Sequence, residues 1–295
     1  MSESMSPGLF ARLAPALFVV LWSTGFVGAR FAAPYAEPMT TLVMRFIGAI
    51  AVFGVWAVVA RAPWPSWRPA SHALIVGALL HGCYLGGVFI AIDHGLPAGP
   101  SALIVSLQPL LTGLLTALLA VERIGAWRWT GIALGFAGVV LVTLPKLSGP
   151  EGWPVSGILF CTGSLVAITL ASAWQKRFAT GIDMRTGGIL QYLGAVAFLG
   201  PFAAIFETQT IDWTPELVFA LSWMVLVLSL GAVSLYMVLL SRGSLVSTTS
   251  LMYLVPAVTA VMAWLMFDER LLPVQLAGLA ISTLGVALVT RKRSA

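Results

Sequence analysis

The sequence predicts an all-α membrane protein with ten transmembrane helices, arranged as two inverted repeats of five helices each. Three observations lead to this fold class: the composition, a series of long apolar runs, and an internal repeat. Of the 295 residues, 59% are hydrophobic and only 9% are charged. Soluble globular domains carry about 25% charged residues. A chain of this composition therefore needs lipid as part of its solvent.

Ten apolar runs are long enough to cross the hydrocarbon core, which takes about 20 helical residues. They are too long and too uniform for the alternating strands of a barrel. The first run also exceeds the core of a signal peptide, which spans about 7–15 residues, so we expect it to remain as the first helix. The predicted helices cover residues 10–32, 39–60, 72–92, 96–119, 126–144, 154–177, 184–206, 216–240, 243–266 and 273–291.

The short connections leave no room for a separate soluble domain. The longest gap, 61–71, holds about eleven residues, and the sequence contains no phosphate-binding loop motif. An ATP-driven pump on this chain alone is therefore excluded. Motifs of serine hydrolases and zinc proteases are also absent, and the histidines lack metal-ligand spacing. We expect no enzyme, no metal and no other cofactor, with Cys83 and Cys161 as small buried hydrophobic side chains.

The distribution of Lys and Arg predicts the orientation. Assigning successive connections to alternate sides puts twelve of these residues on one side and three on the other. Because cytoplasmic flanks are enriched in Lys and Arg, both termini are expected in the cytoplasm of a bacterial cell with the chain in its inner membrane. The net charge of +5 then reflects flanks that contact anionic lipid, and no nucleic-acid partner is expected. The twelve are Arg12, Arg61, Arg68, Arg123, Arg128, Lys176, Arg177, Arg185, Arg242, Arg291, Lys292 and Arg293.

The chain also resembles itself at an offset of 147 residues. Residues 98–143 align without a gap on 245–290, so that Pro109 matches Pro256 and the pair 122–123 matches the pair 269–270, both Glu-Arg. Each half, 1–147 and 148–295, is then one five-helix repeat of a single transmembrane unit. Because five is odd, the second repeat enters the membrane from the opposite face. Inverted repeats are common in alternating-access transporters, which bind their substrate near the midplane.

Particular motifs carry a resemblance to a known family. The segment 22–26 (Trp-Ser-Thr-Gly-Phe), Arg45, and the runs that begin at Pro109 and Pro256 resemble those of the ten-helix exporters of the drug/metabolite transporter superfamily. In these exporters the EamA-type domain occurs twice, and within the superfamily the chain resembles the bacterial aromatic amino acid exporters. The resemblance implies a central cavity walled by helices 1, 3, 4, 6, 8 and 9. The halves differ where Tyr192 aligns with Arg45, which implies an asymmetric site.

Polar and aromatic residues at mid-depth are the candidates for the site, because such residues are costly in a bilayer unless they are paired or wet. Each has a structural alternative: a neutral histidine tied to a neighbouring helix, a tryptophan in the packed interior, a static proline kink, or a small polar stripe that packs helices. The candidate substrate-binding residues are Trp22, His81, Tyr84, Gln108, Ser164, Ser229 and Tyr253, and the candidate hinges are Pro109 and Pro256.

No acidic residue lies at mid-depth in the predicted helices. Exchange of a proton for a cation at a buried carboxylate is therefore disfavoured, and dications are unlikely substrates on the same ground. Arg45 lies within the second predicted helix. It has two interpretations: a structural one, in which it reaches the interface or holds a carbonyl, and contact with a substrate carboxylate.

These observations favour an exporter of small metabolites, in particular aromatic or neutral amino acids, that works by alternating access. A broad exporter of drugs or toxic compounds is the alternative in the same class. An integral-membrane enzyme acting on lipid is the alternative in another class, and the missing nucleophile and base motifs count against it. A small-molecule substrate and the lipid bilayer are the expected partners, and a monomer would suffice.

Overall fold

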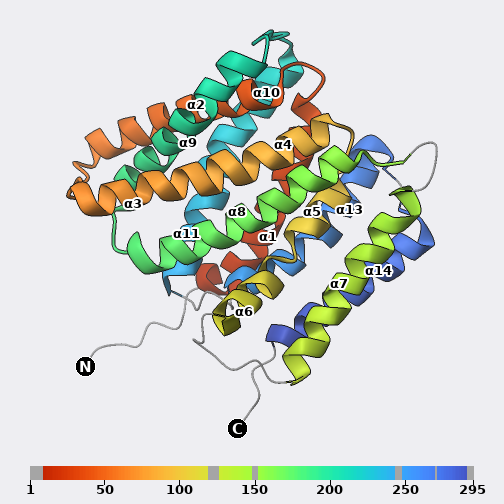
Figure 1. Cartoon of the computed structure of the whole chain (residues 1–295). Coiled ribbons are helices and arrows are strands. Elements are labelled where there is room, and N and C mark those ends of the chain that lie inside the picture. The colour runs from red at the N-terminus through yellow and green to blue at the C-terminus, as the bar shows by residue number, and fades with distance from the viewer. Residues whose placement is uncertain (1–8, 119–125, 148–151, 243–247, 270, 291–295) are drawn as a thin grey trace.

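A computed structural model describes residues 9–118, 126–147, 152–242, 248–269 and 271–290. Within these ranges the chain is helical, and a single isolated bridge between Ala36 and Ile211 is the one β-type pairing. Figure 1 shows the helices packed side by side along a common direction, with α7 and α14 forming a pair at one edge. The predicted all-α class is confirmed for the part of the chain that the structure describes.

The helices of the first half follow the predicted apolar runs, with two differences. The run predicted at 72–92 begins earlier, at Trp67, because its first turn carries interfacial rather than apolar residues. The run predicted at 96–119 is interrupted by a turn at 106–107. The elements are α1 (Leu9–Ala32), α2 (Pro38–Val59), α3 (Trp67–Gly77), η1 (Ala78–Leu85), α4 (Gly86–Asp93), α5 (Ala98–Val105), α6 (Gln108–Leu118) and α7 (Ala126–Leu147).

The second half has the same order of elements. Several helices in the chain begin at a proline, which fits the first turn because its missing N–H has no partner there in any case. The elements are α8 (Val155–Phe178), α9 (Met184–Phe206), α10 (Pro215–Trp223), η2 (Met224–Ala232), α11 (Val233–Arg242), η3 (Ser250–Tyr253), α13 (Val255–Phe267) and α14 (Pro273–Thr290).

By length and composition, seven helical stretches within the described residues could cross a membrane. Two further apolar helices, Val255–Phe267 and Pro273–Gly285, are shorter. The count of ten spanning helices stays a prediction. The seven are Leu13–Ala32, Pro38–Val59, Trp67–Asp93, Ala98–Leu115, Val155–Phe178, Met184–Phe206 and Pro215–Arg242.

Two π-helical segments occupy equivalent places in the two halves. The offset of 147 carries η1, residues 78–85, onto residues 225–232 of η2. It also carries the turn at 106–107 onto 253–254, where the helix is interrupted again before α13. Because π-helical segments are rare and gather at functional sites, their recurrence at one offset is independent support for the internal repeat.

The contact between α7 and α14 is reciprocal. A Cβ atom at Gly138 would overlap the backbone of Gly278 and Ser282, and one at Gly285 would overlap Gly131 and Gly135. The offset of 147 converts the first contact into the second. A self-complementary contact of this kind is what a two-fold axis produces.

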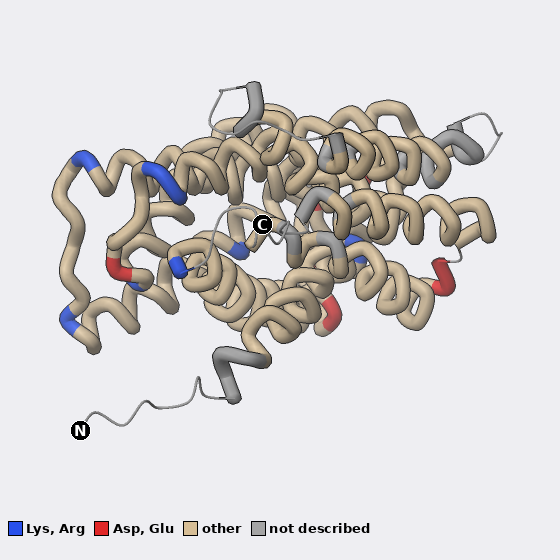
Figure 2. Tube along the Cα trace, turned by 90° about the horizontal axis from the view of Figure 1, so that it is seen from below, with Lys and Arg blue, Asp and Glu red and all other residues tan. Residues whose placement is uncertain are grey.

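The surface of the bundle is apolar along its length and charged at its ends. Large side chains such as Val58, Phe136 and Ile205 are more than half exposed, which suits contact with lipid. Figure 2 shows most Lys and Arg gathered toward one end, with acids toward the other. We call these the basic end, marked by Arg61, Arg68, Lys176, Arg177 and Arg185, and the acidic end, marked by Glu37, Asp93, Glu207, Asp212 and Glu216.

Candidate functional site

A small cavity of about 30 Å³ lies in the middle of the bundle, between the two halves. The first half contributes Trp22, Arg45, His81 and Tyr84 to its wall. The second half contributes residues of η2 and α11, among them Val233. The volume is sufficient for a water molecule or two and not for a metabolite, so the site is occluded in this structure.

Aromatic rings form one wall of the central cavity. Trp22 and Tyr84 are nearly parallel, with ring centroids 6.3 Å apart and an interplanar angle of 7°. On its other side Trp22 packs against Tyr236 at 5.1 Å, and Tyr236 stacks on Phe18. Such ring pairs prefer offset or tilted arrangements and hold one another in place. The wall therefore offers flat apolar surfaces to whatever enters the cavity.

Arg45 also lines this cavity and is only 2% exposed. Its Nε donates to the Ser229 hydroxyl at 3.0 Å, and the Tyr192 hydroxyl donates to the Ser229 carbonyl at 2.9 Å. Arg45 and Tyr192 align at the repeat offset, so the two equivalent residues converge on one residue of η2. No carboxylate among the residues that the structure describes pairs with Arg45.

His81 connects the central cavity to a chain of amides. Its Nε2 lies 3.4 Å from the Gln191 Oε1, and Gln191 in turn donates from Nε2 to the Gln175 Oε1 at 3.1 Å. The Tyr192 ring packs on the imidazole at 4.7 Å. The other imidazole nitrogen, Nδ1, is buried and has no hydrogen-bond partner. With Nε2 as the donor, Nδ1 is a free acceptor.

The structure brings Trp22, His81 and Tyr84 together around the cavity, with Ser229 directly behind Arg45. It places Gln108 outside the cavity wall, where its Nε2 donates to Ser172 at 2.8 Å and Ser172 shares a hydrogen bond with Tyr236. Gln108 thus supports the aromatic wall from behind.

Two other candidates have different surroundings. The Ser164 hydroxyl donates to the carbonyl of Phe160, and its side chain packs on Gly87, where a Cβ would overlap it. This is a helix-packing position, the structural alternative for small polar residues. The side chain of Tyr253 lies outside the described residues.

Both candidate hinge prolines lie at helix starts and not within continuous helices. Pro109 is the second residue of α6, which follows the turn at 106–107, and Pro256 is in the first turn of α13. At such positions proline costs no helical hydrogen bond. The expected kink is therefore a full interruption of each helix, and the role of the prolines as hinges stays a prediction.

A larger cavity of about 510 Å³ lies toward the basic end. Its wall includes Gln175, Gln191, Tyr192 and Met237, and it shares Val233 with the central cavity. The side chains of Gln191 and Tyr192 thus stand between the two cavities. We call this larger cavity the vestibule. A metabolite that entered the vestibule would contact Tyr192 and His81 before it contacted Trp22.

A cavity of about 380 Å³ at the acidic end is confined to helix ends and connections. Its wall includes Arg30, which lies 3.7 Å from the Glu269 carboxylate. Burial raises the pKa of Glu269, although Arg30 opposes the shift. A void of about 10 Å³ shares Phe89 with the central cavity and Asp93 with this one.

Hydrogen bonds join two connections across the acidic end. The Glu207 carboxylate accepts from the backbone N–H groups of Met39 and Thr40, and from the Thr40 hydroxyl, each at 2.7 Å. The backbone N–H of Asp212 donates to the Tyr35 carbonyl at 2.8 Å. Because Glu207 caps the start of α2 from the far half of the chain, it holds the two halves together at this end.

Glu37 makes the reciprocal contact from the first half. Its carboxylate accepts from the Thr208 hydroxyl at 2.9 Å and from the Gln209 N–H at 2.8 Å. Burial acts to raise the pKa of Glu37, but the hydrogen bonds from Thr208 and Gln209 leave it below its ordinary value. The carboxylate therefore stays ionised and bound at neutral pH.

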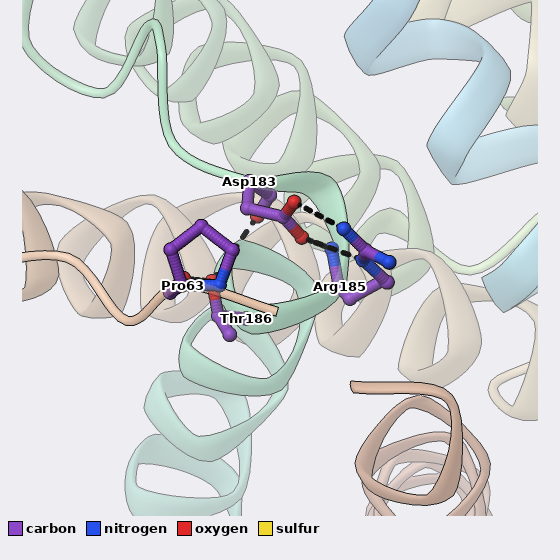
Figure 3. A network of polar contacts seen from close by, with 4 residues as sticks. All are labelled: Pro63, Asp183, Arg185 and Thr186. Atoms are coloured by element: carbon purple, nitrogen blue, oxygen red, sulfur yellow. Dashed lines mark hydrogen bonds and ion pairs between the residues drawn. The ribbon is translucent and has the colours of Figure 1, made fainter. Parts of the chain in front are cut away.

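The equivalent connections at the basic end are joined more sparsely. Figure 3 shows the Thr186 hydroxyl donating to the Pro63 carbonyl, a distance of 3.0 Å, while Asp183 and Arg185 pair with each other. The hydrogen bond from the Arg185 side chain lowers the pKa of Asp183 to about 2. Asp183 also accepts from the Arg185 N–H at the start of α9. Asp183 thus serves its own helix, while the guanidinium carbon of Arg185 lies 5.8 Å from the ring of Trp56 in the first half.

Sequence reasoning missed three residues of the site: Gln191, Tyr192 and Tyr236. Tyr192 carried a signal, because it aligns with Arg45 at the repeat offset. Tyr236 shares a helix face with Ser222 and Ser229, a polar stripe that the sequence favours as a packing surface. Gln191 carried no signal, since a single polar residue in an apolar helix does not reveal which neighbour it faces. Arg45 was identified, but its missing counter-ion could not be known before the surrounding helices were placed.

Comparison with known proteins places this architecture in a family. The model of the EamA-like transporter family matches residues 9–144 and 155–291, one match in each half of the chain. The uncharacterized inner membrane transporter YedA of Escherichia coli K12 is 26% identical over 277 residues, which cover 93% of this chain and 88% of YedA.

Other relatives and one solved structure agree with that match. A probable amino-acid metabolite efflux pump of Escherichia coli K12 is 25% identical over 281 residues, covering 92% of this chain and 91% of that protein. A crystal structure with 22% sequence identity superposes with a TM-score of 0.67 and covers 94% of this chain and 96% of its own. At that identity the crystal structure supports the fold alone.

Proposed function

We propose that this chain, which belongs to the EamA-like transporter family, exports small metabolites from the cytoplasm by alternating access. Aromatic or neutral amino acids are the proposed substrates. The observation that carries the proposal is the central cavity, whose wall includes Trp22 and His81 from one half and Val233 from the other. An alternating-access site lies at such an interface between repeats.

The internal repeat supports the proposal. The π-helical segments η1 and η2 recur at the offset of 147, as do the helix interruptions before α6 and α13. The reciprocal contact between α7 and α14 fits a two-fold axis between the halves. We propose that this axis lies in the membrane plane, so that an opening at one end has an equivalent at the other.

The basic end is the cytoplasmic one in this proposal, by the enrichment of Lys and Arg on cytoplasmic flanks. The vestibule of about 510 Å³ then opens to the cytoplasm, while Glu207 and Glu37 hold the periplasmic end together. In this proposal the structure represents an inward-facing state with an occluded central site. An exporter binds its substrate from the cytoplasm in the inward-facing state.

Counterflow in liposomes tests the function directly. Purified protein is reconstituted into vesicles loaded with an unlabelled amino acid, and accumulation of the radiolabelled form is followed without any added cofactor. We expect accumulation for aromatic or neutral amino acids. The absence of accumulation across the full panel of twenty would contradict the proposal.

Conservative variants at the site sharpen that test. His81 is 1% exposed and Tyr84 is 2% exposed, so truncation to alanine would leave a void that costs about 2–5 kcal/mol. His81→Gln replaces the imidazole by an amide of similar size, and Tyr84→Phe keeps the ring and removes only the hydroxyl. We expect His81→Gln to lower the counterflow rate about tenfold, whereas Ser164→Ala, at the packing position on α8, should leave it near the wild-type value.

A further inference from the structure

Arg45 is a buried cation that the protein binds from one side only. A guanidinium carries five N–H donors, and Arg45 uses Nε for its hydrogen bond to Ser229. No other hydrogen bond joins its side chain to a residue that the structure describes. The other N–H donors of the guanidinium belong to a residue that is 2% exposed and lines the central cavity.

The charge of Arg45 has no partner of opposite sign in the described part of the chain. The acidic residues found there lie in connections or at helix ends, and those that form ion pairs do so with Arg30 and Arg185. The ring of Phe46 lies 5.7 Å from the guanidinium carbon and offers partial compensation. Because an uncompensated buried cation is strongly unfavourable, a cation at this position points to an anionic ligand.

The purely structural interpretation does not account for the residue type. A hydrogen bond to Ser229 requires only a neutral donor, and Tyr192, at the equivalent position of the other half, supplies one to the same residue. Glutamine or tyrosine could do the same at position 45 without carrying a charge into the membrane. A mid-membrane charge that faces a cavity is therefore better explained by a ligand than by packing.

We propose that Arg45 is the carboxylate-binding residue of the central site, and that the transported class consists of small monocarboxylates with an apolar or aromatic side chain. This inference rests on the proposed transport function. The planar guanidinium matches a carboxylate in a two-point contact. In the same cavity, Trp22 and Tyr84 provide flat apolar surfaces, and the free Nδ1 of His81 provides an acceptor for a second polar group.

The same arrangement excludes other substrate classes. An organic cation would enter a site that already holds an unpaired positive charge, which disfavours a broad exporter of cationic drugs. A phosphate ester or a dicarboxylate carries more negative charge than one arginine neutralises, and no second Lys or Arg lines the cavity. One cation beside an aromatic wall fits a single carboxylate.

The test compares an acid with its amide in the wild-type protein. The amino acid that gives the highest counterflow is competed with unlabelled acid or with its carboxamide, which has the same size and lacks the negative charge. We expect the carboxamide to compete at least tenfold more weakly than the acid. Equal competition by acid and carboxamide would overturn the role of Arg45 and leave the transport function intact. The absence of counterflow with every amino acid would instead refute the proposed function.

Three variants extend the test to the residue itself. Arg45→Gln should lower counterflow at least tenfold and abolish the preference for acid over carboxamide, whereas Arg45→Lys should retain the preference. Arg30→Gln, at the acidic end, is the matched loss of charge and should leave the preference unchanged. If Arg45→Gln elutes as an aggregate, the competition between acid and carboxamide in the wild-type protein still tests the proposal. Thermal stabilisation of the wild type by the acid and not by the carboxamide would support the role of Arg45. An unchanged preference in folded Arg45→Gln would refute the proposal.

Discussion

The two ends of the bundle are built from equivalent connections and are held in different ways. The repeat offset carries the connection around Tyr35 at the acidic end onto the one around Ile182 at the basic end. At the acidic end, two carboxylates and a backbone pair join the halves. At the basic end, the hydrogen bond from Thr186 to Pro63 is the one that joins the corresponding connections among the described residues.

In the proposed mechanism, this difference lets one architecture adopt two conformations. A strictly symmetric pair of repeats would close or open both ends alike. Here the hydrogen bonds between connections of the two halves gather at one end, and the large cavity lies at the other. In the opposite state we expect the bonds of Glu207 and Glu37 to break and the connections near Pro63 and Asp183 to close. The predictions below address first what the halves share and then how they differ.

The largest effect on stability is expected at the contact between α7 and α14, where the two halves are alike. Gly138→Ala and Gly285→Ala each place a Cβ against the backbone of the facing helix, and the backbone cannot move aside as a side chain could. Each should cost about 2 kcal/mol or more, and the two losses should be similar because the contacts are reciprocal. Gly163→Ala, with open space around the new Cβ, is the control. Denaturation in detergent measures all three, and a loss at only one glycine would argue against the two-fold relation.

Removal of the carboxylate at the acidic end comes next. Glu207→Ala removes the acceptor of the Met39 and Thr40 N–H groups at the start of α2. Loss of a helix cap costs about 0.5–2 kcal/mol. Ala36 is 7% exposed in the structure. We also expect a cysteine at position 36 to react faster with a maleimide in Glu207→Ala than in the wild-type background.

Thr186→Val is the matched change at the basic end, since it removes the hydrogen bond to Pro63. It should lower stability less than Glu207→Ala and should not increase the reactivity of a cysteine at Ala36. Equal effects of the two variants would mean that the acidic end is not the more firmly held one.

A smaller effect is expected at the partition between the cavities. Tyr192→Phe keeps the ring between Phe46 and His81 and removes the hydrogen bond to the Ser229 carbonyl. One such bond contributes about 1 kcal/mol. We expect a modest fall in melting temperature and faster counterflow, because Ser229 and Tyr192 separate more easily. Unchanged flux with lowered stability would assign Tyr192 to packing alone.

The smallest effect belongs to Asp183, which caps α9 and does not bridge the halves. Its folded-state pKa of about 2 lies below its ordinary value, so ionised Asp183 stabilises the fold above pH ~4 and loses that contribution as the pH falls toward 2. Asp183→Asn should cost no more than about 0.5 kcal/mol at pH 7. The melting temperatures of the variant and the wild type should converge as the pH approaches 2, and a constant difference down to pH 2 would contradict this account.

Much of the fold could be predicted from the sequence because lipid demands long apolar runs. The runs that became α1, α2, α8 and α9 differ from the predicted ranges by at most one residue at each end. The interruption at 106–107 was missed, since Ser106 and Leu107 break no apolar pattern. Prolines mark such places only approximately, because a proline two or three residues later is also compatible with a continuous, kinked helix.

The site could be predicted in part for a similar reason. Depth along a helix can be counted from its ends, which singled out Trp22, His81 and Tyr84. The direction in which a side chain points depends on neighbours that no single helix encodes. For that reason Ser164 and Gln108 were grouped with residues they do not join, and the convergence of Arg45 and Tyr192 on Ser229 emerged only from the structure.

The central claim is that the two ends open in alternation around one site, and distance measurements between spin labels test it most directly. In a chain with Cys83 and Cys161 replaced, one pair of labels spans the acidic end at Pro34 and Gln209, and another spans the basic end at Trp64 and Thr180. All four positions are exposed. On addition of a transported amino acid to protein in nanodiscs, we predict that the acidic-end distance lengthens in a fraction of molecules while the basic-end distance shortens in the same fraction. Distances that both lengthen, or that do not respond to a substrate shown to be transported, would contradict the account.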